Sequence, residues 1–329
     1  MNKTNIETLY TYLDEVAAYL EKEWNIAYLE GLAEAGENLF QKDVCQPLSE
    51  DKRRFLHEKL INISELEYKA EDVRKAFQLT VLKGMKGAVQ PHHSMTPDAV
   101  CLFLSYLTNK VLGKNKEKAT ILDLALGSGN LLSALANHST VPLHAYGFEV
   151  DETLLKLAFV SANLQKHEFN LFHKDSIEPL AIGEVDLVVT DLPVGFYPKE
   201  EIARSYELKA DNSHSYIHHL MIEQAIHATK EGGYLFFIIP NFLFEGEQAA
   251  KLNNFIKDHT AILGLLQLPK TMFQSEQATK SIFMLQKKSK TSKVPRQALL
   301  AELPSFSNME ALADMIEQIN KWFEQELKN

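Results

Sequence analysis

The sequence predicts an α/β protein in which a doubly wound, seven-stranded and mostly parallel sheet follows a helical N-terminal domain. Three observations lead to this fold class. Apolar residues repeat every three or four positions over the first 85 residues, as in amphipathic helices. From Thr120 onward, short apolar runs alternate with helical stretches, which predicts parallel strands joined by helical crossovers. The first of these runs ends in a glycine-rich turn, where sheets of this kind bind ligands.

The composition is that of a globular protein. The chain has 329 residues, 45% of them hydrophobic and 24% charged, which suits one large domain and one smaller domain. No apolar run reaches the length of a membrane span, and the first residues lead into a polar helical pattern rather than a signal peptide. Cys45 and Cys101 lie far apart, without the spacing of a metal site or a disulfide. We therefore expect a cytoplasmic protein with no membrane partner and no metal.

The net charge bears on nucleic-acid binding. Its formal value of −10 disfavours a duplex-DNA binder, because such proteins neutralise phosphates with basic surfaces. A local basic groove on an acidic chain would still allow DNA or RNA to bind, so nucleic acid stays open as a partner.

Residues 1–85 are expected to form the helical N-terminal domain. One apolar helix face repeats at intervals of three and four, and it comprises Ile6, Leu9, Tyr10, Leu13, Val16, Leu20, Trp24 and Ala27. The stretch from Met1 to Met85 holds 11 Lys and Arg against 16 Asp and Glu. This acidic balance favours a surface that contacts protein, either a partner or a second copy, over an arm that binds DNA.

Residues 86–288 are expected to form the sheet domain. Its strand-like runs are mostly continuous rather than alternating, which is typical of a sheet covered on both faces. They are Ala119–Ala125, Leu143–Phe148, Asn170–His173, Val185–Thr190, Tyr234–Ile239, Ala261–Leu268 and Ser281–Leu285. Because Pro269–Lys280 contains no long helical pattern, the last two runs predict a closing antiparallel pair.

Residues 289–329 are expected to form a linker and a C-terminal helix. Ser307 and Glu310 have the spacing of a capping box, which predicts the start of that helix. Its apolar face predicts a helix packed on the body of the protein, or a contact with a second copy.

The turn after the first strand predicts a nucleotide-like ligand. Ile121–Asn130 runs from a strand through Asp123, Ala125, Gly127, Ser128 and Gly129 to a helix that begins near Asn130. Glycines let the backbone approach a ligand closely, and the start of a helix offers free N–H groups. This turn therefore predicts the first part of a binding site.

Two further corners add polar groups. Glu149, followed by Val150, ends the second strand and lies 22 residues after Gly127, a spacing at which a carboxylate can accept both ribose hydroxyls. Asp175 and Ser176 follow the third strand, where an acid can meet an adenine amino group. Together these corners predict a nucleoside site.

The identity of the nucleoside follows from Leu132 and Asp123. A dinucleotide fingerprint would place a third glycine at the position of Leu132. Asp123 has no use beside a pyrophosphate, but it can accept from the ammonium group of a sulfonium amino acid. The sequence therefore favours S-adenosylmethionine over NAD.

The fourth corner, Val189–Pro198, resembles a motif of the class I amino-methyltransferases. Its Asp191-Leu192-Pro193-Val194 segment is similar to the Asn/Asp-Pro-Pro-Tyr/Phe motif of adenine-N6 DNA methylases, most closely those of type I restriction-modification systems. Further similar segments occur in the family's order between His92 and Lys288. They are Ser94–Asp98 with Thr96, which borders the cofactor in the family, Glu231–Gly233, Ile239–Asn241, Leu268–Phe273 and Lys287–Lys288.

The resemblance implies a Rossmann-like methyltransferase fold and DNA methylation at an exocyclic amine. Asp191 and the Leu192 carbonyl would accept hydrogen bonds from the amine, and Pro193 would complete the transfer site. Leu192 departs from the family's first proline, and Val194 departs from the aromatic residue that stacks on the base. Phe196 or Tyr197 would then supply the ring, and we expect Tyr197 to do so.

Two alternatives to base methylation stay open. The chain could be a non-catalytic module that binds S-adenosylmethionine, which the Val194 departure would suit. It could also methylate a protein or small-molecule nitrogen, which the acidic charge would suit. About forty residues follow Lys288, too few for a target-recognition domain, so a DNA methylase of this kind would need a specificity subunit.

Overall fold

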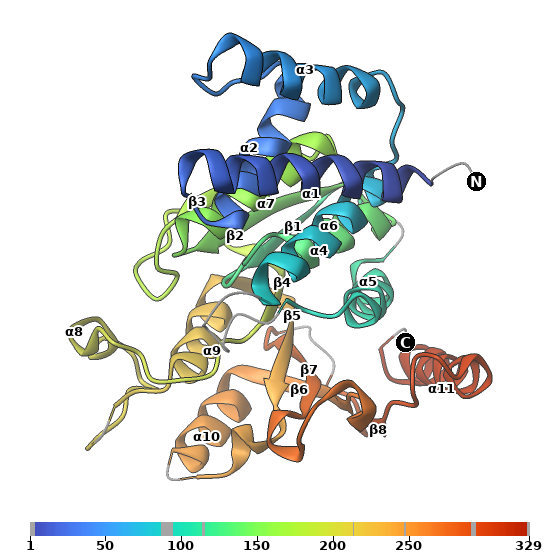
Figure 1. The fold of residues 1–329 in the computed structure, drawn as a ribbon. Coiled ribbons are helices and arrows are strands. Elements are labelled where there is room, and N and C mark those ends of the chain that lie inside the picture. Colours follow the sequence, from blue (N-terminus) through green and yellow to red (C-terminus); the bar gives the residue numbers. More distant parts are fainter. Residues whose placement is uncertain are drawn as a thin grey trace. The chain divides into compact units, whose positions relative to one another are not determined.

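A computed structural model describes residues 4–86, 95–113, 116–212, 214–246, 248–290 and 294–327. Its strands form a mostly parallel sheet of eight in the order β3-β2-β1-β4-β5-β7-β6-β8 (Figure 1). They are β1 (Ala119–Asp123), β2 (Leu143–Glu149), β3 (Asn170–His173), β4 (Val185–Asp191), β5 (Thr229–Pro240), β6 (Thr260–Gln267), β7 (Lys280–Lys287) and β8 (Leu299–Glu302). All seven predicted strands are present. The predicted count is one too low, because β8 lies in the segment expected to be a linker.

The chain divides into two compact units. One unit comprises Met1–Tyr106 and Leu126–Lys174, and the other comprises Leu107–Ala125 and Asp175–Asn329. We call them the helical unit and the sheet unit, after the elements that dominate each.

The helical unit is built on amphipathic helices. They are α1 (Asn5–Trp24), α2 (Tyr28–Gln41), α3 (Glu50–Ser64), α4 (Ala70–Lys86), the first part of α5 (Asp98–Leu112), α6 (Asn130–His138) and α7 (Glu152–Leu164). The predicted apolar face of α1 is largely confirmed, since Leu9, Leu13, Val16 and Leu20 are all buried. Thr4 caps this helix in a reciprocal box with Glu7, which satisfies backbone donors at its start.

The core of the helical unit crosses a large gap in the sequence. Leu154, Leu157 and Val160 of α7 belong to the same buried cluster as the apolar faces of α1 to α4. Gly36 of α2 permits this packing, because a Cβ there would lie 2.6 Å from a methyl group of Val160 and 2.8 Å from the ring of Phe77. The N-terminal helices therefore pack on α7, the helix that follows β2, with β2 and β3 in the same unit.

The sheet unit contains β1 and β4 to β8. Its helices are α8 (Glu200–Ala203), α9 (Ile217–Ala228), α10 (Ala249–His259) and α11 (Met309–Glu326), with 3₁₀ turns η1 (Asn241–Phe244), η2 (Lys270–Met272) and η3 (Glu276–Ala278). The antiparallel closure predicted from the sequence is confirmed, because β7 runs antiparallel to both β5 and β6. The centre of the sheet is apolar on both faces, and Phe236, Phe237 and Phe283 are fully buried.

The C-terminal helix α11 is present, but its predicted cap is wrong by one residue. Asn308, not Ser307, is the N-cap, and its side chain accepts from the Ala311 N–H at 3.2 Å. Trp322 secures the helix by donating its indole N–H to the Gln297 carbonyl at 2.8 Å. Within the described residues, every helix is too short or too polar to cross a membrane.

Candidate functional site: four corners at the carboxyl ends of the strands

The glycine turn has the open backbone that its sequence predicts. Gly127 and Gly129 adopt positive φ angles of 57° and 78°, which favour glycine. A Cβ on Gly127 would meet nothing within 4 Å, whereas one on Gly129 would lie 3.0 Å from the Ala158 Cβ. Gly127 thus faces open space where a ligand can approach, and Gly129 allows α6 and α7 to pack closely.

Glu149 is oriented by three backbone N–H groups of the helical unit. Its Oε2 accepts from Gly127 at 2.7 Å, and its Oε1 accepts from Val150 and Asp151 at 2.8 and 2.9 Å. Three backbone donors fix the direction of the carboxylate. The structure therefore joins the predicted ribose acceptor to the predicted glycine turn within one unit.

Asn130 and Thr96, two further predicted cofactor residues, are buried beside each other. The Asn130 amide donates to the Thr96 carbonyl at 3.3 Å and accepts from Arg74 of α4 at 2.9 Å. Sequence reasoning missed Arg74, because nothing in the pattern of α4 distinguishes it from a surface arginine. Ser94, at the start of the Thr96 segment, lies outside the described residues.

In the sheet unit, Asp123 is buried at the end of β1. Its Oδ1 accepts from the Ala125 N–H at 3.1 Å, and the Leu124 N–H donates to Thr190 Oγ1 at 3.0 Å. These bonds fix the chain where β1 leaves the sheet beside β4. The carboxylate therefore has a defined place before the glycine turn.

Asp175 is held by side chains from the fourth corner. Its Oδ2 accepts from the Tyr197 hydroxyl at 2.8 Å and lies 3.1 Å from Lys199 Nζ, while its Oδ1 accepts from the Ile177 N–H at 3.0 Å. Next to it, the buried Ser176 hydroxyl finds no hydrogen-bond partner among the described residues. An orphaned buried hydroxyl of this kind is expected where a ligand supplies the missing partner.

Tyr197 is placed differently from an exposed stacking ring. Its side chain is only 2% exposed. Burial, followed by the hydrogen bond to Asp175, raises the pKa of its hydroxyl. In this structure, Tyr197 supports Asp175 with its hydroxyl and fills the core with its ring.

Phe196 presents the exposed ring of this corner. It is 59% exposed and lies parallel to Tyr216, with ring centroids 5.1 Å apart and an interplanar angle of 17°. Two backbone bonds fix the loop, from the Tyr197 N–H to the Ser215 carbonyl at 2.8 Å and from the Ile217 N–H to the Gly195 carbonyl at 3.0 Å. The chain therefore displays an aromatic face on a rigid support.

Asp191 forms an ion pair that the sequence did not predict. Lys280, the first residue of β7, places its Nζ 2.7 Å from Asp191 Oδ1, and both side chains are largely buried. The two residues are 89 positions apart, so no spacing rule could pair them. Leu192 follows with its side chain in the core and its N–H bonded to the Ile238 carbonyl at 3.1 Å.

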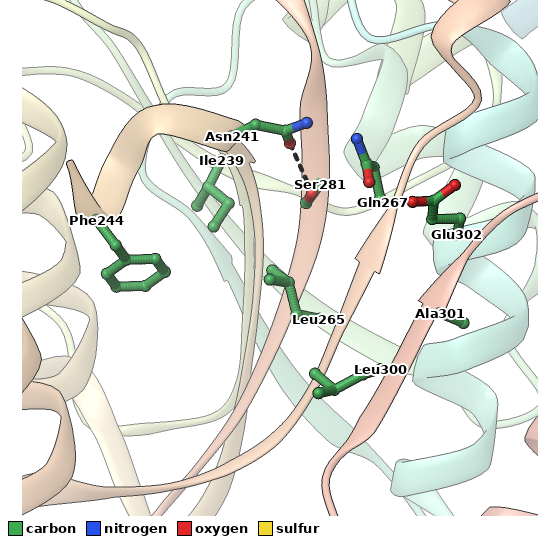
Figure 2. A pocket seen from close by; sticks show the side chains of 9 residues that line it. All are labelled: Ile239, Asn241, Phe244, Leu265, Gln267, Ser281, Leu300, Ala301 and Glu302. Atoms are coloured by element: carbon green, nitrogen blue, oxygen red, sulfur yellow. Dashed lines mark hydrogen bonds between the residues drawn. The ribbon is translucent and has the colours of Figure 1, made fainter.

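A separate hollow of about 600 Å³ lies over β5, β6, β7 and β8, on the face of the sheet opposite to the Lys280 side chain (Figure 2). Strand register places Ile239, Ser281, Gln267 and Glu302 in one row across β5, β7, β6 and β8. Because side chains alternate along a strand, this row faces away from Lys280. The hollow is therefore distinct from the corner that carries Asp191.

Two family models match the chain: YtxK N-terminal helical domain over residues 7–85, and N-6 DNA Methylase over residues 91–328. A relative from Bacillus subtilis (strain 168), uncharacterized protein YtxK, is 50% identical over 99% of this chain and 100% of its own length.

Solved structures agree with these family matches. A candidate class I S-adenosylmethionine-dependent methyltransferase from Listeria monocytogenes is 40% identical, with a TM-score of 0.91 over 97% of this chain and 99% of that chain. The methyltransferase subunit of a type I restriction-modification system from Streptococcus thermophilus is 14% identical, with a TM-score of 0.66 over 97% of this chain and 74% of that chain. The second similarity is one of fold.

The fold and its glycine turn define a class I S-adenosylmethionine-dependent methyltransferase. The chain belongs to the N-6 DNA methylase family, and a YtxK N-terminal helical domain precedes its methylase region. The cofactor, the type of reaction and the resemblance to adenine-N6 methylases predicted from the sequence are thereby confirmed.

Proposed function

We propose that the chain transfers a methyl group to the exocyclic amine of a nucleobase in DNA or RNA. The observation that carries this proposal is the fourth corner. There, the polar groups of Asp191 and Leu192 are followed by the exposed, stacked ring of Phe196. Acceptors for an amine, followed in the same corner by an exposed aromatic ring, suit a flipped or unpaired base.

The cofactor-binding residues are proposed from the chemistry of each corner. Glu149 would accept the ribose hydroxyls, and Val150 is exposed next to it. In the glycine turn, Gly127 leaves room for the ligand, and Ser128 and Gly129 would complete the turn that binds it. Asp123, with Ala125, would accept from the ammonium group. Asp175 and the orphaned Ser176 hydroxyl would meet the adenine. Thr96 and Asn130 would support the turn, and Asp191 would lie beside the methyl group.

The chain's own residues would act mainly by positioning. Bound S-adenosylmethionine supplies an electrophilic methyl group on its sulfonium. Asp191 and the Leu192 carbonyl would accept the amine hydrogens and so direct the nitrogen lone pair, with Pro193 fixing the turn. Phe196 would hold the plane of the base in place of the family's aromatic residue, which is Val194 here.

The Lys280 ion pair favours a base over a lysine side chain as acceptor. Lys280 balances the charge of Asp191, so the pair attracts a second cation weakly. The exocyclic amine of a base is uncharged and needs only a hydrogen-bond acceptor, whereas an alkylammonium group would face Lys280. This observation argues against a protein lysine as acceptor, and an uncharged nitrogen of a protein or small molecule stays the alternative.

Recognition of a specific sequence is proposed to need a partner. The N-terminal helices offer a groove of about 630 Å³ between α1 and α4, lined by Tyr10, Leu79 and Leu82 among others. The C-terminal helix α11 is the other candidate contact, for a protein partner or a second copy.

The direct test is transfer of a labelled methyl group into separate DNA, RNA, protein and metabolite fractions. Label in nucleic acid is expected. Label confined to protein or metabolites would reject the base as acceptor, and absence of label with intact cofactor binding would indicate a binding module. Calorimetry with S-adenosylmethionine tests the cofactor residues, and Glu149→Ala is expected to weaken binding.

Phe196→Ala tests the stacking role. Loss of base stacking is expected to lower kcat/KM for a base acceptor by roughly tenfold or more, because a stacked base contributes about 1–3 kcal/mol. Phe55→Ala is the matched control, since Phe55 is an exposed ring packed on Tyr19 in the helical unit. Equal activity of the Phe196 variant and the wild type would contradict the stacking role. Unchanged affinity for S-adenosylmethionine shows that the variant is folded.

A further inference from the structure

Arg74 is a buried arginine in the N-terminal helices, outside the corners described above. It lies on α4, is 1% exposed and makes four hydrogen bonds within the helical unit. Two go to Glu71 at 2.8 and 2.5 Å, one to Asp98 at 2.5 Å and one to Asn130 Oδ1 at 2.9 Å. Burying a guanidinium is costly unless its donors are satisfied, so this network fixes the side chain in one geometry.

The fourth bond ends at the glycine turn. Asn130 is the first residue of α6, immediately after Gly129. Its amide also donates to the Thr96 carbonyl at 3.3 Å. One arginine of α4 therefore fixes the residue that joins the glycine turn to its helix and, through it, the segment that precedes α5.

A second contact joins α4 to the far end of the same helix. Glu71 accepts from the Asn137 side chain at 3.1 Å, in the last turn of α6. Burial alone would raise the pKa of Glu71, but hydrogen bonds from Arg74 and Asn137 outweigh it and lower the pKa to about 2. Glu71 thus stays ionised. The Glu71–Arg74 pair holds α6 at both ends.

The glycine turn needs such support. Gly127 and Gly129 have little conformational preference of their own, so the position of their N–H groups depends on what anchors the flanking residues. Arg74 anchors the residue on the C-terminal side of the turn, Asn130, by a charge-assisted hydrogen bond.

We infer that Arg74 is a positioning residue for S-adenosylmethionine: the N-terminal helical domain holds the glycine turn in its binding geometry through the Arg74–Asn130 contact. This inference rests on the cofactor-binding role proposed for Gly127–Asn130. Arg74 itself acts through Asn130. The helical domain is then part of the cofactor site, in addition to any role in binding partners.

The test compares Arg74→Lys and Arg74→Met with the wild-type full chain. Lysine keeps the charge beside Glu71 and Asp98 but cannot satisfy three partners, so Arg74→Lys is expected to fold and to release Asn130. We expect the Kd for S-adenosylmethionine to rise about tenfold, the effect of one charge-assisted hydrogen bond. Arg53→Lys is the matched control, because Arg53 forms an exposed ion pair with Asp43 in the same helical domain.

A second measurement needs no ligand. Deuterium uptake of the peptide covering residues 126–133 is expected to rise in Arg74→Lys and in Asn130→Ala. The Arg74→Lys/Asn130→Ala double variant is expected to show no larger effect than Asn130→Ala alone. A structural role without positioning would lower the melting temperature and leave both the Kd and this uptake unchanged.

The outcomes separate this inference from the proposed function. Unchanged uptake in folded Arg74→Lys overturns the positioning role, whatever the protein methylates. A second outcome combines two results: uptake rises in Arg74→Lys, but the wild-type chain binds no S-adenosylmethionine. That outcome would support the Arg74–Asn130 contact and reject the proposed cofactor site. Should Arg74→Met not fold, because two carboxylates lose their partner, Arg74→Lys and Asn130→Ala still decide the question.

Discussion

Carboxylates at three corners are oriented by the protein itself. Backbone N–H groups hold Glu149, Tyr197 and Lys199 hold Asp175, and Lys280 holds Asp191. A carboxylate whose direction is fixed loses little further freedom when a ligand binds, so preorganisation of this kind favours binding. Each side chain comes from the element that its sequence position predicted. Glu149 and Asp175 also accept from neighbouring backbone N–H groups, but each of the three carboxylates has at least one partner that is distant in the sequence.

Two buried histidines at the start of α9, unlike these carboxylates, each have a ring nitrogen without a hydrogen-bond partner in the described part of the chain. His218 and His219 are both nearly inaccessible, and their Nδ1 atoms find no partner among the described residues. Burial lowers the pKa of His218 to about 4. Burial and the neighbouring His218 lower the pKa of His219 to about 3. Both are therefore neutral in the fold, which excludes them as exposed proton donors near neutral pH.

These histidines predict acid sensitivity. In the unfolded chain they take up protons as pH falls below about 6.5, whereas the folded state resists protonation until about pH 4. Their contribution to the free energy of unfolding is therefore fully present above about pH 6.5 and is lost as the pH drops toward 4. At pH 5 the expected loss is about 1–2 kcal/mol per histidine. Urea unfolding at pH 7 and pH 5 measures this loss, and His218→Gln/His219→Gln is expected to reduce it.

The exposed His57 of α3 provides the control for that comparison. His57→Gln is expected to leave the difference between pH 7 and pH 5 as in the wild type. An equal pH dependence in the double variant and the wild type would exclude buried histidines as its origin.

At the scale of elements, prediction succeeded for the seven apolar runs and failed for the edge strand β8. The strands of the sheet centre are continuous apolar runs, which only a covered sheet accommodates. β8 has four residues, an exposed Leu300 and no neighbour on its outer edge among the described strands. Its pairing with β6 depends on the partner strand, so its own sequence carried no strand signal.

The start of α11 gives a prediction at this scale. Asn308→Ala removes the side chain that accepts from the Ala311 N–H and is expected to destabilise the chain by about 1 kcal/mol. Ser307→Ala is the paired variant, because the sequence favoured Ser307 as the cap and the structure does not. Thermal unfolding of both variants decides between them. A larger loss of thermal stability for Ser307→Ala than for Asn308→Ala would favour Ser307, the cap predicted from the sequence.

At the scale of the whole molecule, the N-terminal helices and α7 of the methylase region share one core. The sequence changes character near residue 85, but Leu154, Leu157 and Val160 of α7 pack into the cluster formed by α1 to α4. Packing thus joins segments that composition separates. This shared core also explains why α4 can support the glycine turn.

A chain without residues 1–86 is expected to lose cooperative unfolding. The apolar face of α7 would meet water, at a cost of about 2 kcal/mol for each large side chain. In the full chain, Leu13→Ala and Leu157→Ala are each expected to lower the free energy of unfolding by about 3 kcal/mol, because both side chains lie in the shared core. Circular dichroism and calorimetry check both claims. A truncated chain with a sharp, native-like transition would show that the helices are dispensable for folding.

The sequence by itself determined the alternating architecture, the glycine turn, the acidic corners and the resemblance to adenine-N6 methylases. These depend on local patterns, namely apolar period, glycine placement and residues that follow a strand. Only the tertiary structure decided the partners: Lys280 for Asp191, Tyr197 for Asp175 and Arg74 for Asn130. These contacts join residues 22 to 89 positions apart, and a local pattern cannot specify which distant side chains the packing of helices and strands brings together.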